Sequence, residues 1–214
     1  MKRISILDYG AGNIFSIKNA VEKCGYKAIL TSDFDQILKS THLIFPGVGS
    51  FDNCMQKLKD KNIFEKLKTI QNKKIWVLGI CVGMQALFNY SEEGKKSEGL
   101  GIINGAVKKM NINENYGIQK VPFIGWKKIV LSEKETEMKI FSSITQEDRF
   151  YFIHSYECVP NTREYIIADV DYNKKRVCAV VKKKNIFGCQ FHPEKSGVAG
   201  LNIIKNFIEH ENMN

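Results

Sequence analysis

IWVLGICVGMQALF, residues 75–88, is the stretch that decides the fold of this chain. Its first part, Ile75 to Leu78, is short and apolar and contains β-branched residues, which is typical of a strand buried on both faces of a parallel sheet. Its last part, Met84 to Phe88, consists of good helix formers. The stretch therefore predicts a buried strand, a tight turn and a helix.

The turn itself, Gly79-Ile80-Cys81-Val82-Gly83, has the form G-x-C-x-G, the thiol counterpart of a nucleophile elbow. Glycine is needed on both sides because such a turn brings neighbouring backbone too close for a Cβ. The turn would place Cys81 at a helix N-terminus, where backbone N–H groups and the helix dipole favour the thiolate and can hold an oxyanion. We predict that Cys81 is a nucleophile. The alternative is that it is a small buried apolar residue, as most free cysteines are.

The length of 214 residues is enough for one sizeable core, so we expect a single domain over residues 1–214. The sequence has no long uncharged apolar stretch, and Met1-Lys2-Arg3 passes directly into the strand-like Ile4 to Leu7. We therefore expect a soluble, cytoplasmic protein with no membrane segment.

The cysteines and lysines indicate neither a metal site nor a nucleic-acid surface. The six cysteines lie far apart without a C-x-x-C pair, so we expect reduced thiols, no zinc site and no disulfide scaffold. The formal net charge is +9, but the lysines are scattered in pairs and triples, and no run alternates basic with aromatic residues. Solvated surfaces are a better explanation of this charge than nucleic-acid binding.

The N-terminal segment predicts a strand over Arg3 to Leu7 and then a helix that begins near Ile14 and stops at Gly25. Gly10-Ala11-Gly12 between them invites comparison with a dinucleotide-binding turn. Phe15 occupies the third glycine position, however, and no acidic residue closes the next strand, Lys27 to Leu30. No nucleotide cofactor is expected.

The segments that follow continue the alternation of strands and helices. A short helix capped by Ser32, a strand over Leu43 to Phe45 and a helical stretch from Phe51 to Ile70, broken near Asp60, lead to the strand before Cys81. This order predicts an α/β fold with a mostly parallel sheet and helices on both faces.

Sites in such folds lie at the carboxyl ends of the strands. Asp8 to Asn13, Pro46 to Ser50 and Cys81 all fall at such ends, so we expect them to meet in one cleft. The glycine-rich turn Pro46-Gly47-Val48-Gly49-Ser50 is either an ordinary loop or half of an oxyanion hole that presents backbone N–H groups.

Between Gly99 and Asp171 the pattern changes to short strands and turns, which we expect to add antiparallel strands to the sheet. A polar loop is expected at Asn111 to Gly117. The predicted strands of this region are Ala106–Met110, Lys128–Val130, Phe150–Ile153 and Tyr165–Asp169.

Near the end of the chain, His192-Pro193-Glu194 follows a predicted strand over Ile186 to Phe191. In extended backbone His192 and Glu194 would project to the same side, and Pro193 would stiffen the pair and exclude a helix. A carboxylate so placed can orient the imidazole and stabilise the imidazolium, although a histidine at a strand end is often only structural. A final helix, with Val198, Leu201, Ile204, Phe207 and Ile208 on its buried face, would close the domain.

Three motifs together resemble the class I glutamine amidotransferases, whose glutaminase domains carry a Cys-His-Glu triad in this chain order: Gly79 to Gln85, Pro46 to Gly49, and Gly188 to Glu194. Asp8 to Asn13, Gly125-Trp126 and Tyr151 to Tyr156 narrow the resemblance to the glutaminase subunits of imidazole glycerol phosphate synthases. It covers nearly the whole chain and implies a flavodoxin-like core.

The resemblance implies that Cys81 attacks the side-chain amide of glutamine while His192, oriented by Glu194, protonates the departing ammonia. The oxyanion would be held by the N–H of Val82 and by an amide of Val48 or Gly49. Gln85 and the backbone of His154, Ser155 and Tyr156 would contact the substrate. No cofactor and no metal is implied.

The resemblance also implies a partner, a (β/α)8-barrel cyclase that forms a heterodimer with the glutaminase and consumes the ammonia in making imidazole glycerol phosphate for histidine biosynthesis. Asp8 to Asn13 and Pro122 to Trp126 would lie at that interface. The chain reads Pro-Phe-Ile-Gly-Trp-Lys at 122–127, where these subunits usually read Pro-His-Met-Gly-Trp-Asn. A paralogous glutaminase that supplies ammonia to a surface-sugar amidotransferase is therefore an alternative.

A second alternative is a non-catalytic binding protein or a redox protein on the same fold. A degenerate binding protein should lose a residue of the triad, and Cys81, His192 and Glu194 are all present. A redox role requires a resolving thiol, and the sequence offers none close to Cys81.

Overall fold

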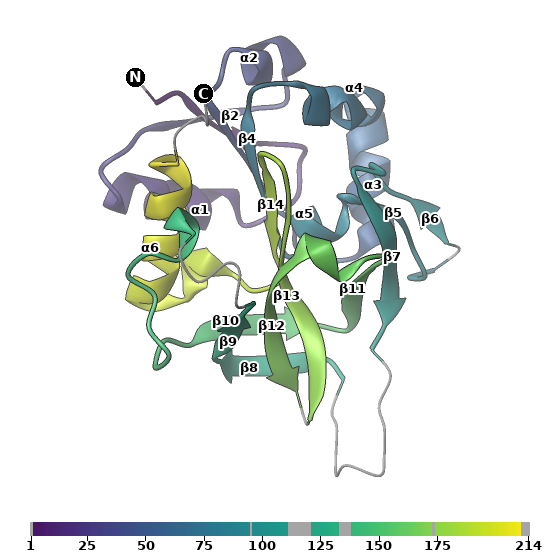
Figure 1. Ribbon diagram of the computed structural model, residues 1–214. Helices are drawn as coiled ribbons and strands as arrows, with labels where there is room; N and C mark the ends of the chain where they lie inside the picture. Colours follow the sequence, from purple (N-terminus) through teal and green to yellow (C-terminus); the bar gives the residue numbers. More distant parts are fainter. Residues whose placement is uncertain (1, 95, 111–120, 133–137, 173, 211–214) are drawn as a thin grey trace.

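The computed structural model describes residues 2–94, 96–110, 121–132, 138–172 and 174–210, in three sheets with flanking helices (Figure 1). The loop expected at Asn111 to Gly117 lies outside these residues. The strands are β1 (Ile4–Leu7), β2 (Ala28–Thr31), β3 (His42–Phe45), β4 (Trp76–Ile80), β5 (Phe88–Ser91), β6 (Ser97–Glu98), β7 (Ile103–Lys109), β8 (Phe123–Lys127), β9 (Ile129–Leu131), β10 (Phe150–His154), β11 (Tyr156–Pro160), β12 (Ile166–Tyr172), β13 (Lys175–Lys183) and β14 (Ile186–Cys189). The α-helices are α1 (Ile14–Lys23), α2 (Phe34–Leu38), α3 (Phe51–Asp60), α4 (Phe64–Lys68), α5 (Val82–Gln85) and α6 (Gly197–Ile208), and the 3-10 helices are η1 (Thr69–Asn72), η4 (Lys139–Phe141), η5 (Arg163–Tyr165) and η6 (Pro193–Lys195).

The main sheet has eight strands in the order β2-β1-β3-β4-β14-β13-β12-β9. The strands β2, β1, β3, β4 and β14 run parallel, and β13, β12 and β9 add antiparallel pairs at one side. Strands β1, β3, β4 and β14 are buried along their whole length, as expected for the centre of a sheet covered on both faces. The predicted α/β alternation is confirmed.

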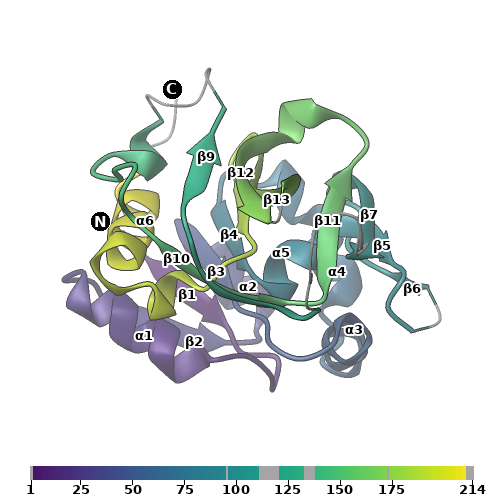
Figure 2. The ribbon, with the colours of Figure 1, turned by 90° about the horizontal axis from the view of Figure 1, so that it is seen from below.

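Helices cover both faces of this sheet. Figures 1 and 2 show α1 and α6 together on one side and α3, α4 and α5 on the other. The two groups bury opposite faces of the same strands, because apolar helix faces gain free energy only when they pack against another apolar layer. One continuous core includes Ile6, Ile44, Leu78 and Phe187 from the strands and Phe207 from α6.

The later strands differ in part from the expectation. Only β9, β12 and β13 join the main sheet as antiparallel additions. Strands β11, β7, β5 and β6 form a separate sheet, in which β5 and β7 are parallel, and β8 pairs with β10 in a two-stranded sheet. The sequence pattern missed β8 and β11 as strands, because short segments acquire extended structure from the partner strands with which they pair.

The helix expected over Met84 to Phe88 is wrong beyond its first turn. Helix α5 ends at Gln85, and β5 begins at Phe88. The carbonyls of Ala86, Leu87 and Phe88 accept hydrogen bonds from the segment Leu100–Ile103. These non-local bonds and the complete burial of Phe88 outweigh the helix propensity of the segment.

Two details of the helices also correct the predictions. The side chain of Asp33, and not that of Ser32, caps α2 by accepting a hydrogen bond from the N–H of Asp35. Val198 is 75% exposed and does not belong to the buried face of α6. The buried Ile204 lies six positions further along α6, and at about 100° per residue Val198 points roughly 120° away from that side chain.

No helix among the described residues combines the length and the apolar character needed to cross a bilayer.

Candidate functional site

Cys81 lies in the turn between β4 and α5, at the carboxyl ends of the parallel strands. Its backbone has φ 53° and ψ −110°, a conformation that costs free energy for any residue with a Cβ. The conformation is held by the surrounding packing: the Cys81 N–H donates to the carbonyl of Cys189 on β14, and the residue is 5% exposed. Cys81 is thus fixed as the N-cap of α5, next to the unpaired N–H groups of its first turn.

The glycines around Cys81 are required by close backbone contacts. A Cβ on Gly79 would come within 2.6 Å of the Gly83 carbonyl oxygen, and one on Gly83 within 2.0 Å of the Phe45 carbonyl oxygen. A Cβ on Gly47 would meet the Gly83 nitrogen at 2.4 Å. The glycines therefore allow the turn of Cys81 to fold tightly and to press against the end of β3, which confirms the reason given for the G-x-C-x-G pattern.

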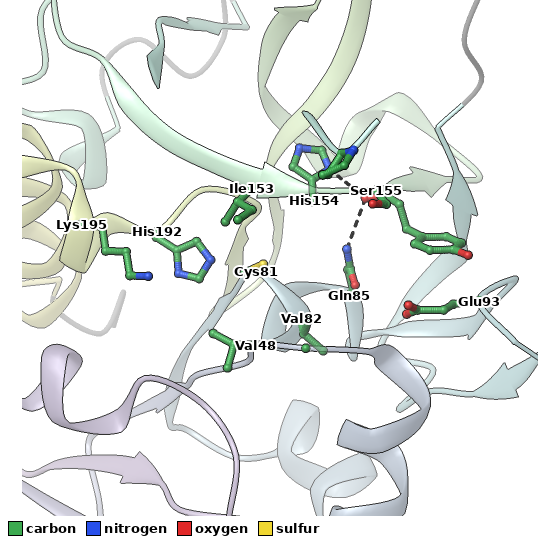
Figure 3. A pocket seen from close by; sticks show the side chains of 13 residues that line it. Val48, Cys81, Val82, Gln85, Glu93, Ile153, His154, Ser155, His192 and Lys195 are labelled. Atoms are coloured by element: carbon green, nitrogen blue, oxygen red, sulfur yellow. Dashed lines mark hydrogen bonds between the residues drawn. The ribbon is translucent and has the colours of Figure 1, made fainter. Parts of the chain in front are cut away.

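The sheet order brings His192 to Cys81. Strand β14 pairs with β4 in parallel, with Cys189 opposite Ile80, so the residues after β14 emerge beside the turn of Cys81. The His192 N–H donates to the Tyr151 carbonyl, which anchors the residue. In Figure 3 the imidazole points toward Cys81.

His192 and Glu194 form a buried pair. Nδ1 of His192 donates to Oε1 of Glu194 over 2.8 Å, and the two side chains are 3% and 0% exposed. The geometry differs from the prediction of extended backbone, because Pro193–Lys195 is the 3-10 helix η6 with proline at its first position. Proline is compatible with a first helical turn, since the N–H that it lacks has no partner there.

The pKa of His192 reflects both of its neighbours. Burial lowers this pKa, but hydrogen bonds and charge interactions with Cys81 and Glu194 outweigh burial and raise it from 6.5 to about 9. Since Nδ1 faces Glu194, Nε2 is the nitrogen available to Cys81. The pair therefore favours an imidazolium beside the sulfur at neutral pH.

A cavity of about 350 Å³ opens above Cys81 (Figure 3). Nine of the ten predicted site residues line it, and Glu194 lies behind His192. The nine are Cys81, His192, Val82, Val48, Gly49, Gln85, His154, Ser155 and Tyr156. Residues from four separate parts of the sequence thus meet at one place.

One wall of the cavity is organised by the Tyr156 carbonyl. This oxygen accepts hydrogen bonds from Nδ1 of His154 over 2.9 Å and from Nε2 of Gln85 over 3.3 Å. Burial, the largest influence, lowers the pKa of His154 to about 4, although its hydrogen bond to Tyr156 acts in the opposite direction. His154 is therefore a neutral imidazole at neutral pH.

The sequence reasoning missed three polar residues of the site. Glu93 and Lys195 line the cavity, and Gln190 lies beneath it with a donor 3.6 Å from Sγ of Cys81. Glu93 falls in a charged segment that is typical of a surface loop, so no sequence signal distinguishes it. Lys195 directly follows Glu194, and Gln190 lies within the motif Gly188 to Glu194; these positions were the signal that could have marked them.

The segment Asp8 to Asn13 does not line the cavity, contrary to the expectation that it shares the cleft. It supports the neighbouring turn instead: the Tyr9 hydroxyl donates to the Pro46 carbonyl over 3.0 Å, and a Cβ on Gly12 would come within 3.1 Å of the Pro46 side chain.

The chemistry of the site is that of a thiol. All six cysteines are free. Burial raises the pKa of the Cys158 and Cys189 thiols well above its usual value and disfavours their thiolates. Among the described residues, no group of three or more His, Cys, Asp or Glu side chains is arranged to hold a metal ion. A thiol nucleophile, an imidazolium and a buried carboxylate can together perform acyl transfer.

Comparisons with known proteins agree with this geometry. Residues 5–210 match the protein-family model "Glutamine amidotransferase class-I". The chain is 42% identical over 207 residues to "Imidazole glycerol phosphate synthase subunit HisH 2" of Methanococcus maripaludis, covering 96% of this chain and 98% of that protein. It is also 42% identical over 210 residues to the subunit HisH of Acinetobacter baylyi, covering 98% of each.

Solved structures share the fold at low sequence identity. A structure described as "Crystal structure of glutamine amidotransferase" aligns with a TM-score of 0.72 at 14% identity, over 96% of this chain and 97% of that chain. A structure of PurLQS from Thermotoga maritima aligns with a TM-score of 0.69 at 20% identity, over 97% and 98%. From the family match over nearly its whole length, the chain belongs to the class-I glutamine amidotransferases, and by its relatives to the HisH family within them.

Proposed function

We propose that the chain is a glutaminase subunit that hydrolyses glutamine to glutamate and ammonia with the triad Cys81, His192 and Glu194. The observation that carries this proposal is the buried contact of His192 with Glu194, which leaves the other imidazole nitrogen for Cys81. A thiol, a base and an orienting carboxylate have distinct roles in such a triad.

In the first step, the Cys81 thiolate attacks the side-chain carbonyl carbon of glutamine and forms a C–S bond. The His192 imidazolium donates its Nε2 proton to the amide nitrogen, the C–N bond breaks, and ammonia leaves. A glutamyl thioester remains on Cys81. The charge of Glu194 stabilises the imidazolium that is needed at this stage.

In the second step, neutral His192 removes a proton from water as the water oxygen bonds to the thioester carbon. The C–S bond then breaks, Cys81 leaves as a thiolate, and glutamate is released. His192 is again an imidazolium, so the starting state is restored.

The negative charge on the substrate oxygen would be held by the N–H of Val82 and by an amide of the turn at Val48 and Gly49. Val82 follows the nucleophile at the start of α5, and all three residues line the cavity. Gly49 has φ +90°, a conformation that glycine adopts without a Cβ penalty. Losing one oxyanion donor costs on the order of 10²–10³ in rate in other enzymes, so the orientation of this turn would control activity.

The part of the cavity farthest from His192 would bind the amino-acid end of glutamine. Glu93 lies there, beyond Gln85 as seen from His192 (Figure 3), and is the acidic lining residue whose carboxylate is suited to an ammonium group. The N–H of Phe51 donates to Oε2 of Glu93 over 2.7 Å and holds the side chain in place. Gln85 and the backbone of His154 to Tyr156 would complete the contacts with glutamine.

The ammonia would be passed to a cyclase subunit of the (β/α)8-barrel type in a cytoplasmic heterodimer that makes imidazole glycerol phosphate for histidine biosynthesis. The names of the relatives support this over the surface-sugar and redox alternatives. Exposed apolar side chains near the cavity also support a protein partner: Ile124 is 56% exposed, Trp126 48% and Ile153 40%. The family match over residues 5–210 and the continuous core support one glutamine amidotransferase domain.

The test is glutamate release from glutamine by the purified chain, alone and with the histidine-pathway cyclase or a paralogous cyclase of the same organism. Each mixture is measured with and without the imidazole-pathway ribotide. The expected result is strong stimulation by the ribotide-loaded histidine-pathway cyclase, abolished by Cys81→Ala. Stimulation only by the paralogue would assign the subunit to another acceptor, and no release with any partner would refute the glutaminase proposal.

A further inference from the structure

Gln190 is completely buried beneath the cavity, immediately after β14, and touches both the nucleophile and a predicted substrate-contact residue. Its Nε2 lies 3.6 Å from Sγ of Cys81, and its Oε1 accepts a hydrogen bond from Nε2 of Gln85 over 3.2 Å. The thiol of Cys158 lies 4.0 Å from the same oxygen. The mechanism proposed above gives this side chain no role.

The hydrogen-bond chain fixes which end of the Gln190 amide faces the sulfur. The Tyr156 carbonyl can only accept, so the group of Gln85 that lies 3.3 Å from it must be the NH₂ group. The same NH₂ group contacts Gln190, so the Gln190 atom that meets it must be the carbonyl oxygen. The remaining NH₂ group of Gln190 therefore points at Cys81, and the reverse orientation would place two acceptors or two donors against each other.

We propose that Gln190 is a positioning residue that donates a hydrogen bond to the Cys81 thiolate and fixes the direction of its attack. This inference rests on the proposed glutaminase function. A hydrogen bond to a charged acceptor in a buried site stabilises the charged form and restricts its rotation. His192 approaches the sulfur as a mobile proton carrier, whereas Gln190 keeps its protons and acts in every step in which the sulfur is charged.

The hydrogen bond from Gln85 to Gln190 also connects the nucleophile to the wall of the cavity. Since one NH₂ group of Gln85 bonds both to Gln190 and to the wall of the cavity, the nucleophile and the substrate-contact residue are held in one rigid network. Buried networks of this kind rigidify a site when every member is satisfied.

The other titratable groups around Cys81 stay unchanged in the variants described below, so they do not account for an altered pH profile. These groups are His192 with Glu194 behind it, Tyr9 two residues after β1, Cys158 on β11, Cys189 on β14, and His154, Tyr156, Glu93 and Lys195 in the cavity.

The experiment uses Gln190→Met, which keeps the volume without the donor, and Gln190→Glu, which keeps an acceptor for Gln85 but places an oxygen at the sulfur. The first readout is the rate of Cys81 alkylation by iodoacetamide against pH, measured on the chain alone. We expect the reactive form to appear at a pH about one unit higher in Gln190→Met than in the wild type, and at a still higher pH in Gln190→Glu.

The second readout is glutaminase activity in the complex with the cyclase partner. For Gln190→Glu, kcat should fall about tenfold or more while KM for glutamine changes less than about threefold, because the contact with Gln85 is kept. Gln190→Met should change both constants, because it also frees Gln85. Asn206→Leu is the matched control: Asn206 is also buried, at 8% exposed, and donates two hydrogen bonds, but it lies on α6 away from the cavity.

Wild-type alkylation profiles and kcat values in both Gln190 variants would overturn the inference, since a residue that only fills space would behave in this way. If Gln190→Met does not fold, the isosteric Gln190→Glu decides alone. The alkylation readout needs no glutamine and no partner. An altered profile with no glutamate release by the wild-type complex would therefore refute the glutaminase function separately from the contact of Gln190 with the sulfur.

Discussion

Replacing Glu194 by glutamine should lower the pKa of His192 and weaken the triad without changing its shape. The carboxylate is completely buried, and its Oε1 accepts the Nδ1 proton of His192 over 2.8 Å. The amide of the Glu194→Gln variant would keep an oxygen for this hydrogen bond but would lack the charge that stabilises the imidazolium. The direction is therefore downward, since a group favours its charged form less when an opposite charge is removed.

The size of the effect follows from the shift of the pKa from 6.5 to about 9. At 1.36 kcal/mol per pKa unit, this shift corresponds to about 3 kcal/mol in favour of the imidazolium, net of the opposing effect of burial. Cys81 and Glu194 supply it by the same two interactions, a hydrogen bond and a charge. Removing the charge of Glu194 should therefore lower the pKa by about one unit or more.

The measurement is a titration of the imidazole resonances by NMR between pH 6 and 10. The chain has four histidines, and His192 is the one whose pKa is raised, because burial lowers the pKa of His42 and His154 to about 4 and lowers that of His210. The alkaline limit of glutaminase activity in the complex should move to lower pH together with the resonance, because acylation requires the imidazolium.

Glu65→Gln is a suitable control, since Glu65 is an exposed carboxylate paired with Lys68 and should leave the titration of His192 unchanged. An unchanged pKa of His192 in Glu194→Gln would refute the assignment of Glu194 as its electrostatic partner. A lowered pKa with an unchanged alkaline limit of activity would refute the role of the imidazolium as the acid.

Three further predictions concern packing and substrate binding. Gly83→Ala should destabilise the chain by about 2 kcal/mol or more in urea unfolding, because the new Cβ would meet the Phe45 carbonyl oxygen at 2.0 Å; wild-type stability would contradict the close contact. Glu93→Gln should raise KM for glutamine about tenfold and should leave the affinity for a glutamine analogue without the amino group unchanged. Equal losses of affinity for both ligands would argue against an ammonium contact. Val198→Ala should change the free energy of unfolding by less than about 0.5 kcal/mol, whereas Ile204→Ala should cost about 2–5 kcal/mol; equal effects would place Val198 in the core.

Much of the candidate site follows from local sequence signals. Cys81 is marked by its flanking glycines, which are needed wherever a strand turns sharply into a helix, and His192 and Glu194 are marked by their spacing and by the strand before them. The extended backbone predicted for the pair is nevertheless wrong, because η6 brings the carboxylate to the imidazole. The same two residues make the contact because they are close in sequence in either conformation.

The sequence by itself determined the order of strands and helices up to Cys81 and the residue types of the proposed triad, since apolar periodicity and glycine spacing act over a few residues. Only the tertiary structure decided the secondary structure of Phe88. It becomes a strand residue through backbone hydrogen bonds to a segment more than ten residues away. The tertiary structure also decided that Glu93 lines the cavity and that Gln190 faces Cys81. The physical reason is the same in each case: these contacts depend on which strands become neighbours, and that choice minimises the free energy of the whole core rather than of any one segment.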